Sequence, residues 1–354
     1  MKILVIQQKM LGDVLLSSIL MTHLKNIYPT SEIHYLVNKG LEPVLQNNIS
    51  IDKVVTVTKN DEKTLSGIFS SLKKIRQHKY DIIIDAYAKN FSYLLTLFSG
   101  AKKKISFKKG YNFFIYTDLV KRIIPARTDR GYAVKNRLIL LDPLTDSKLL
   151  DTSVKPQIYL TSEEIQTAKF KIEQEDINSK FIFMVSAIGS NHEKTYPLKY
   201  MAEFLDYIAQ AIDVSFFFNY TNSQSDQAKE LYNLCADSTK ECIYLDMYEN
   251  NLRDFFALTY HCDALIGNEG GAINIAKALN KPTFAIYSPT TQRSSWSIYE
   301  ETPANTSVHL LDYKPELYEN KKFSEVRRIN DEYFLIFKPT TFKKDLDKFL
   351  STFN

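Results

Sequence analysis

The 354-residue chain has few cysteines, few glycines and no long apolar run, and each shortage excludes a class of protein. Its three cysteines, Cys235, Cys242 and Cys262, are scattered and none has CxxC spacing. A disulfide framework is therefore not expected, and a reducing cytoplasm is the natural compartment. Ten glycines and eleven prolines are too few for a collagen-like or low-complexity chain. No stretch approaches the ~18 apolar residues of a membrane span, so an integral membrane protein is not expected.

The charge is nearly balanced, with 45 Lys and Arg against 41 Asp and Glu. The net charge of +4 does not indicate a nucleic-acid binder, although a local basic face remains possible. At the N-terminus, Lys9 and Asp13 interrupt the apolar run that begins at Ile3, and no small-residue cleavage site follows. We interpret this run as a buried strand and not as a signal peptide.

Short apolar runs alternate with longer helical patterns in the first half of the chain. The runs predict strands at 3–6, 33–37, 53–57, 81–86 and 104–107. Apolar residues at three- and four-residue spacing predict helices at 11–28, 65–77, 91–99 and 131–141. Strands that are apolar on both faces and separated by helices are typical of a parallel sheet covered by helices.

The same alternation restarts after a polar, proline-containing stretch. It predicts strands at 181–185, 214–219, 242–245, 264–267 and 283–287, and helices at 198–212, 223–235, 252–260 and 271–279. We therefore predict an N-terminal domain over 1–145, a linker over 146–160 and a second α/β domain over 161–335. The last segment, 336–354, is predicted to be an amphipathic helix packed on a domain surface. Ligands of such sheets bind outside the carboxyl ends of the strands.

The turn after the first strand carries Gly12 and Asp13. A carboxylate in the first turn of a helix is often only a capping or dipole-stabilising group. The alternative is a carboxylate that takes a proton from a hydroxyl group at the carboxyl end of a strand. The GxGxxG fingerprint of dinucleotide-binding proteins is absent from the turn.

Two further strand-to-helix junctions lie in the second half. Residues 267–276 place glycines between a buried strand and a helix, which fits either a tight turn or a phosphate cradle made of backbone N–H groups. Residues 186–197 offer hydroxyl groups and Lys194, a point charge suited to phosphate. His192 lies in the same polar loop, where a solvated histidine is the more frequent case.

Four segments together resemble the heptosyltransferase-type glycosyltransferases of bacterial lipopolysaccharide core assembly, which have the GT-B fold. They are residues 2–14 with the Gly12–Asp13 pair, 80–86, 194–197 and 268–279, followed by 281–283 and 289–290. No single motif is strongly specific, but the four occur in the family's order over residues 1–290. The resemblance implies an α/β protein of two Rossmann-like α/β/α domains facing a cleft.

The resemblance also implies an inverting, metal-independent transfer of a heptose or related sugar, without a cofactor. The donor would be a nucleotide-diphosphate sugar, with ADP-heptose favoured, and the acceptor a lipopolysaccharide inner-core-type glycolipid. Asp13 would be the general base and Lys194 would contact the donor phosphate. The predicted donor-binding residues are Ser186, Lys194, Asp226, Asn268, Glu269, Gly270, Gly271 and Asn274. Asp226, for the ribose or base, could equally be a carboxylate near a helix start.

The acceptor side is predicted from polar and basic residues of the first domain: Gly12, Lys89, Asn90, Lys104, Arg127 and Arg137. A solvated basic surface is the alternative. Attraction to an anionic membrane face is a further expectation, and a nucleic-acid partner is not expected. The chain departs from the family pattern at Asn274, where many members have His, at Glu269, where many have Asp, and at Ala88, where Gly is frequent.

Three alternative functions stay open on the sequence alone. One is a GT-B glycosyltransferase with another donor sugar, and one is a non-catalytic protein that binds sugar nucleotides or glycans. The third is a hydrolysing epimerase of sugar nucleotides. The only DxD string, Asp345–Leu346–Asp347, lies in the predicted terminal helix, which is a poor place for an ion bridging a diphosphate.

Overall fold

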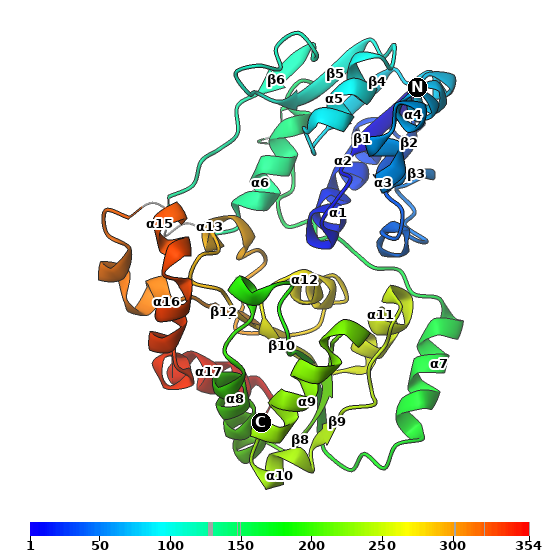
Figure 1. Cartoon of the computed structure of the whole chain (residues 1–354). Coiled ribbons are helices and arrows are strands. Elements are labelled where there is room, and N and C mark those ends of the chain that lie inside the picture. The colour runs from blue at the N-terminus through cyan, green and yellow to red at the C-terminus, as the bar shows by residue number, and fades with distance from the viewer. Residues whose placement is uncertain (127–129, 147, 149, 301, 322, 354) are drawn as a thin grey trace. The chain divides into compact units, whose positions relative to one another are not determined.

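The computed structural model describes residues 1–126, 130–146, 148, 150–300, 302–321 and 323–353. The chain divides into two compact units, Met1–Tyr159 and Leu160–Asn354 (Figure 1). The division falls at the end of the predicted linker. Each unit is a parallel sheet covered by helices, as the alternation of apolar runs predicted.

The N-terminal unit is built on a six-stranded parallel sheet with the order β3-β2-β1-β4-β5-β6. Four of its strands are almost entirely buried, because helices cover both faces. The strands are β1 (Lys2–Ile6), β2 (Glu32–Asn38), β3 (Lys53–Val57), β4 (Ile82–Asp85), β5 (Lys103–Phe107) and β6 (Asp118–Val120). The short edge strand β6 was not predicted.

The helices of this unit follow the predicted pattern with one interruption. They are α1 (Leu11–Ser17), α2 (Ile19–Ile27), α3 (Lys59–Lys63), α4 (Leu65–His78), α5 (Asn90–Leu97) and α6 (Tyr132–Leu138), with 3₁₀ turns at Glu42–Val44 and Ile139–Leu141. The single helix predicted over 11–28 is wrong: at Ser18 the backbone N–H bonds to Leu15 O at 3.1 Å, a tighter turn that separates α1 from α2. Helix α3 was not predicted.

The C-terminal unit has a second six-stranded parallel sheet, with the order β12-β11-β10-β7-β8-β9. When the strands of each unit are numbered from one to six, both sheets have the order 3-2-1-4-5-6, which is the Rossmann arrangement. The strands are β7 (Phe181–Ser186), β8 (Val214–Phe218), β9 (Ile243–Tyr244), β10 (Ala264–Asn268), β11 (Thr283–Ile286) and β12 (Asn305–Val308).

Helices of the C-terminal unit cover this sheet, and the last segment joins its core. The α-helices are α7 (Ser162–Glu173), α8 (Leu198–Ala211), α9 (Ser225–Leu234), α10 (Asp237–Lys240), α11 (Leu252–His261), α12 (Gly271–Ala278), α13 (Arg293–Trp296), α14 (Leu310–Tyr313), α15 (Phe323–Arg328), α16 (Asn330–Ile336) and α17 (Lys343–Leu350). The 3₁₀ turns are His192–Lys194, Asn222–Gln224, Pro315–Tyr318, Pro339–Phe342 and Ser351–Phe353.

The predicted C-terminal helix is shorter than expected. The α-helical part is α17 alone, because Pro339 lies in a preceding 3₁₀ turn where its missing N–H is tolerated. Phe342, Leu346 and Phe349 are fully buried in the core of the C-terminal unit, so the apolar face predicted for this segment packs as expected.

The strand order fixes where each unit can bind a ligand. In the first sheet the order reverses between β1 and β4, whose registers pair Ile6 with Asp85. In the second it reverses between β7 and β10, which pair Ser186 with Gly267. Adjacent strands whose connections leave in opposite directions open a crevice at their carboxyl ends. The segments after β1, β4, β7 and β10 are those that the sequence singled out.

Candidate functional site

The first part of the candidate site lies where β1 ends and α1 begins. Met10, the residue before α1, has φ 65°, a left-handed conformation that costs energy for a side chain other than Gly, and its side chain is exposed. Gly12 and Asp13 follow in the first turn of α1. Backbone strain of this kind is found at sites that position a functional group.

Asp13 forms an ion pair with Arg137 of α6. The Asp13 side chain is 25% exposed and that of Arg137 11%, so the pair is largely shielded from water. The Nε of Arg137 lies 3.3 Å from Ser17 Oγ, which fixes the guanidinium against α1. Arg122 is close enough to respond to both charges: desolvation and the charge of Arg137 lower its pKa, and Asp13 raises it.

The other predicted acceptor residues fall into two groups. Lys89 and Asn90 follow β4 at the start of α5, on the same edge of the sheet as Asp13. Lys104 does not: its Nζ donates to Leu97 O at 3.0 Å, at the last residue of α5, so it lies at the opposite end of that helix from Lys89. We therefore leave Lys104 out of the candidate site. Arg127 lies outside the described residues.

The second part of the candidate site lies where β7 and β10 end. Asn268, the last residue of β10, is buried and joins the two strands. Its Nδ2 donates to the carbonyl groups of Ser186 and Ala187, each at 2.8 Å, and its Oδ1 accepts from the N–H of Tyr196 at 2.7 Å. Asn268 thus fixes both ends of the loop that carries Lys194, at Ser186 and at Tyr196.

Lys194 and Glu269 form the charged centre of this second part. Lys194 Nζ lies 2.9 Å from Glu269 Oε1, and the Thr291 hydroxyl donates to the same oxygen at 2.9 Å. The carboxylate is 8% exposed and the lysine side chain 36%. A nearly buried carboxylate therefore holds a lysine that still reaches solvent, ready to contact an anion.

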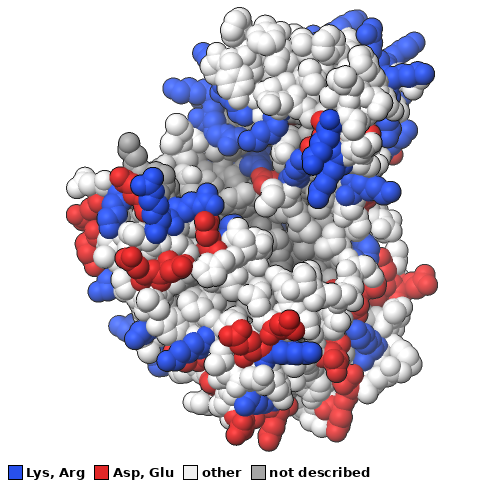
Figure 2. Space-filling model, viewed as in Figure 1, with Lys and Arg blue, Asp and Glu red and all other residues white. Residues whose placement is uncertain are grey.

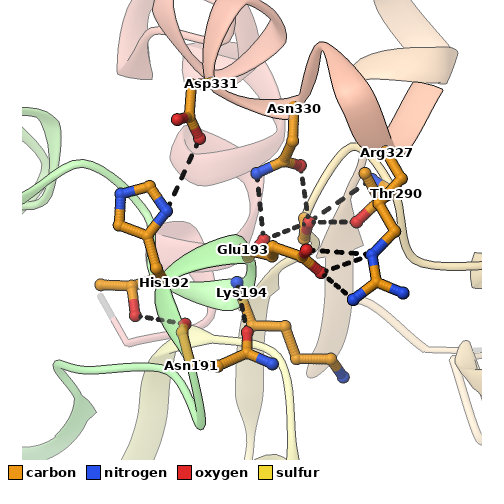
Figure 3. Close-up of polar contacts among 10 residues, drawn as sticks. Asn191, His192, Glu193, Lys194, Thr290, Arg327, Asn330 and Asp331 are labelled. Carbon is orange, nitrogen blue, oxygen red and sulfur yellow. Dashed lines mark hydrogen bonds and ion pairs between the residues drawn. The ribbon is translucent and has the colours of Figure 1, made fainter. Parts of the chain in front are cut away.

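The turn that presents Lys194 is tied down on both sides (Figure 3). Asn191 Oδ1 accepts from the Lys194 N–H at 3.1 Å, and Arg327 of α15 holds Glu193 through two bonds of 2.9 Å. Asn330 and Ser288 also contact the Glu193 carbonyl group. In Figure 3 the Lys194 side chain points away from this cluster, which leaves its ammonium group for Glu269 or a ligand.

Gly189 is required by the same turn. A Cβ placed there would lie 2.3 Å from the carbonyl oxygen of Lys194, a distance that no side chain tolerates. Because the obstacle is backbone, the turn cannot close over a larger residue.

Helix α12 begins in the predicted strand-to-helix junction at residues 267–276. Gly270 precedes it with φ 152°, and a Cβ built there would meet nothing within 4 Å, so there is open space beside Gly270. Gly271 opens the helix and Asn274 bonds back to the Gly270 carbonyl group at 3.1 Å. The N-terminus of a helix carries free N–H groups and a partial positive charge, which suit a phosphate.

A pocket of about 480 Å³ adjoins this part, between the loops that follow β7 and β8. Most of its lining residues are neutral and polar, with one histidine and one isoleucine: Ile188, Gly189, Ser190, Asn191, His192, Thr195, Thr221, Ser223, Gln224 and Gln227. Asp226 is not among these lining residues and is exposed on the first turn of α9. Gln224 and Gln227, which the sequence did not single out, line this pocket, whereas the proposed contact of Asp226 with a ribose or base stays a prediction.

Other contacts of the site were also missed by sequence reasoning. Thr291 and Arg327 act on Glu269 and Glu193 from segments far along the chain, and Arg137 was expected only as an acceptor contact. Tyr87, after β4, is partly buried, and burial raises its pKa, so its hydroxyl group keeps its proton at neutral pH. The sequence signal in this segment was Ala88, which stands where Gly is frequent in the family. The structure explains that preference, since the φ of Ala88 is 51°, a conformation that Gly adopts most readily.

The two units differ strongly in charge. Residues 1–159 contain 25 Lys and Arg against 13 Asp and Glu, a formal charge of +12, whereas residues 160–354 contain 20 against 28, a charge of −8. Figure 2 shows Lys and Arg predominating over the N-terminal unit. The unit that carries Asp13 is therefore the one suited to an anionic partner.

Within the part of the chain that the structure describes, no group of three or more His, Cys, Asp or Glu side chains is placed to hold a metal ion. Asp345 and Asp347 are both engaged, with Tyr313 at 2.6 Å and with Lys343 at 3.1 Å respectively. Among the same described residues, no helix has the length and apolar character needed to cross a bilayer.

Two Rossmann-like units in one chain are the architecture of the two-domain glycosyltransferases, and comparison with known proteins identifies the chain as one of them. The chain is 24% identical over 300 residues to lipopolysaccharide heptosyltransferase 1 of Campylobacter coli, covering 82% of this chain and 84% of that one. It superposes on a family 9 glycosyltransferase of Veillonella parvula with a TM-score of 0.71 at 17% identity, covering 94% and 97% of the chains. For E. coli ADP-heptose lipopolysaccharide heptosyltransferase II the TM-score is 0.66 at 16% identity, covering 95% and 99%.

The family model described as "Glycosyltransferase family 9 (heptosyltransferase)" matches residues 68–326. The chain therefore belongs to glycosyltransferase family 9, and it is a glycosyltransferase with the GT-B fold. The resemblance on which the sequence analysis relied is confirmed. Lys194 and Glu269 lie inside the matched segment, whereas Asp13 precedes it.

Proposed function

We propose that the protein transfers a heptose from ADP-heptose to a lipopolysaccharide inner-core-type acceptor, with inversion and without a metal. The names of the similar proteins support the donor and the acceptor, since they describe lipopolysaccharide heptosyltransferases, one of them using ADP-heptose. The observation that supports the proposal is structural. The segments with Gly12–Asp13 and Lys89–Asn90 follow β1 and β4, and those with Lys194 and Glu269–Gly271 follow β7 and β10, the strand pairs at which the order of each sheet reverses.

In the proposed reaction Asp13 takes the proton of an acceptor hydroxyl group as its oxygen attacks the anomeric carbon of the donor sugar. The carbon–oxygen bond to the diphosphate breaks on the opposite face, and the nucleoside diphosphate leaves with the electron pair. The acceptor oxygen is then bonded to the anomeric carbon of the sugar, whose configuration is inverted. Arg137 orients the Asp13 carboxylate, so we assign it a positioning role.

The departing diphosphate gains negative charge, which the C-terminal unit is equipped to stabilise. The start of α12 offers N–H groups, and Lys194 supplies a positive charge near them. Glu269, which holds Lys194 in the free protein, is the residue that we assign to accept hydrogen bonds from the donor sugar. In this arrangement fixed positive groups do the work that a bridging cation does in other enzymes.

The acceptor is assigned to the N-terminal unit because a phosphorylated, carboxylate-rich glycolipid matches its charge of +12. Gly12, Lys89, Asn90 and Arg137 are the described residues that we assign to this side. Such an acceptor is anchored in a membrane, so we place the protein at the cytoplasmic face of the inner membrane.

The decisive experiment is a thermal-shift panel of nucleotide-diphosphate sugars followed by transfer assays. A ligand bound only by the folded state raises the midpoint temperature of unfolding. The added stability is ~2.7 kcal/mol when the free ligand concentration is a hundred times Kd. ADP-heptose should raise the midpoint and support transfer to deacylated inner-core acceptor. Stabilisation by a UDP-sugar alone would overturn the donor assignment, and donor binding without any transfer would identify a binding protein. Release of nucleotide without acceptor would identify a hydrolysing epimerase.

A further inference from the structure

One face of the N-terminal unit exposes large apolar side chains from three consecutive segments. Helix α4 exposes Leu65 and Phe69, α5 exposes Leu94, and the residue that follows α5, Phe98, is also exposed. The segment between β5 and β6 exposes Tyr111, Phe113 and Phe114, the two phenylalanines at 72% and 64%. Single exposed apolar residues are ordinary, but a run of seven on neighbouring segments marks an interaction surface. We call these seven residues the apolar face.

The connections of the sheet place the three segments on the same side. Three connections run in the same direction across the sheet: β3 to β4, which contains α4, β4 to β5, which contains α5, and β5 to β6. Because crossovers between parallel strands are right-handed, connections that run in one direction lie on the same face of the sheet. Buried residues of α4 and α5, Ile75, Phe91 and Leu95, share one core cluster. The Tyr93 ring of α5 lies 6.2 Å from that of Tyr111, which joins the helix to the aromatic segment.

The aromatic segment is held in shape by a buried asparagine. Asn112 is fully buried, its Nδ2 donates to Phe107 O at 2.9 Å, and its Oδ1 accepts from the Lys109 N–H at 2.9 Å. Ile115 packs inward from the same turn. Phe113 and Phe114 therefore project from a structured turn, and their rings contact each other edge to face at 5.7 Å. Their exposure does not come from a loop without fixed structure.

Positive charge surrounds the apolar face. Residues 65–125 contain twelve Lys and Arg against three Asp, one of which, Asp85, is buried. Lys73 lies one helical turn after Phe69, and Lys102 and Lys108 are exposed beside α5 and the aromatic turn. In Figure 2 an uncharged area, where Figure 1 shows α5, is bordered by Lys and Arg.

We propose that the apolar face docks onto an anionic lipid bilayer, with Phe113 and Phe114 inserted at the headgroup boundary. Aromatic rings favour the membrane–water interface, and each nearby Lys adds attraction to an anionic leaflet. The same face of a second copy is the less suitable occupant, because two N-terminal units of charge +12 repel each other. The aromatic turn begins at the carboxyl edge of the sheet that carries Asp13, so docking brings a membrane-anchored acceptor to that edge.

The test is vesicle co-sedimentation of the full chain without sugar donor or acceptor, so its result is independent of the proposed reaction. Vesicles of equal parts phosphatidylglycerol and phosphatidylethanolamine should bind the protein, and phosphatidylcholine vesicles should bind it more weakly. The double variant F113S/F114S should lower the partition coefficient about tenfold or more. The control variant Phe170→Ser removes an equally exposed phenylalanine from the C-terminal unit and should leave the partition coefficient within about twofold.

Depth of insertion provides a second measurement. Phe114→Trp should be quenched by lipids brominated on their acyl chains, with the wild-type protein, whose single tryptophan is Trp296, as the background. F113S/F114S should transfer sugar to a soluble acceptor at the wild-type rate. Binding that does not depend on Phe113 and Phe114, or a dimer that depends on them in the ultracentrifuge without vesicle binding, would overturn the proposal.

Discussion

Arg137 and Asp13, 124 residues apart in the chain, form a hydrogen-bonded ion pair between α6 and α1. A structural carboxylate at a helix start would be expected to bond the N–H groups of its own helix. Instead Asp13 is held by a cation from a distant helix and stays 25% exposed. This arrangement fixes the direction of the carboxylate without burying it, as a general base requires.

Replacing Asp13 by Asn should lower kcat for transfer by about 10²–10⁴-fold, the usual contribution of a general base. The affinity for the nucleotide donor should be unchanged, because the donor is assigned to the C-terminal unit. Asp118→Asn is the matched control, since Asp118 is 31% exposed in the same unit. Kinetics and donor titration of both variants check the prediction; full activity of Asp13→Asn would remove the base from the mechanism.

Lys194 and Glu269 should affect each other's contribution to stability, whereas ADP binding should depend on Lys194 whether or not Glu269 is charged. Lys194→Met leaves the nearly buried Glu269 carboxylate without its cation, and we expect a loss of about 1 kcal/mol, limited by the partial exposure of the lysine. The double variant K194M/E269Q should regain that stability. It should not regain ADP binding, whose Kd we expect to rise about tenfold in both variants.

Lys199→Met, which removes an exposed lysine from α8, is the control for the pair. Urea unfolding and ADP titration of the wild-type protein and the three variants check the prediction. Recovery of ADP binding in the double variant would mean that Lys194 acts only on Glu269.

Activity should survive removal of divalent ions. In the proposed reaction Lys194 and the start of α12 stabilise the departing diphosphate, so EDTA should leave kcat within about twofold. The assay compares turnover in EDTA with turnover after Mg²⁺ or Mn²⁺ is restored. Loss of turnover that a divalent ion reverses would contradict this part of the mechanism.

The strands that the sequence predicted most clearly are those buried on both faces. Residues 82–85 of β4 read Ile-Ile-Ile-Asp and are all buried, so the apolar run is unmistakable. Two of the edge strands, β6 and β12, were missed because their apolar content is low or their length is short: β12 reads Asn-Thr-Ser-Val and β6 has three residues. Local pattern alone does not distinguish such segments from loops.

The candidate site could be predicted only where one segment carries it. Gly12–Asp13 and Asn268–Gly271 each follow one strand, and the family resemblance pointed to both. The partners of these residues, Arg137 and Thr291, come from other elements, and only the folded chain brings them within bonding distance. Lys104 was misplaced for the same reason, since the sequence does not show which end of α5 it approaches.

Gly189→Ala should destabilise the turn that presents Lys194. The added methyl group would lie 2.3 Å from the Lys194 carbonyl oxygen, and we expect a loss of about 1–3 kcal/mol together with weaker ADP binding. Gly110→Ala is the control, because a Cβ at Gly110 meets nothing within 4 Å. Unchanged stability and ADP affinity in Gly189→Ala would show that the turn can rearrange at no cost.

His309 should make stability depend on pH. Burial lowers its pKa from 6.5 to about 4, so the folded protein keeps the ring neutral while the unfolded chain protonates it. Its stabilising contribution is complete above pH 6.5 and is lost as the pH falls from 6.5 to 4, by about 3 kcal/mol in total. Glu164, whose pKa is lowered to about 2 by its bond to Arg253, loses its contribution only below pH 4.5.

Asn is the appropriate replacement for His309. The His309 side chain caps α14 by accepting from the Leu311 N–H at 3.0 Å, and Asn can make the same bond without a titrating group. Urea unfolding at pH 7, 6, 5 and 4.5 should therefore show a steeper loss of stability in the wild-type protein than in His309→Asn. The exposed His192, replaced by Asn as a control, should leave the wild-type slope intact. Equal slopes for all three proteins would mean that folding does not lower the pKa of His309.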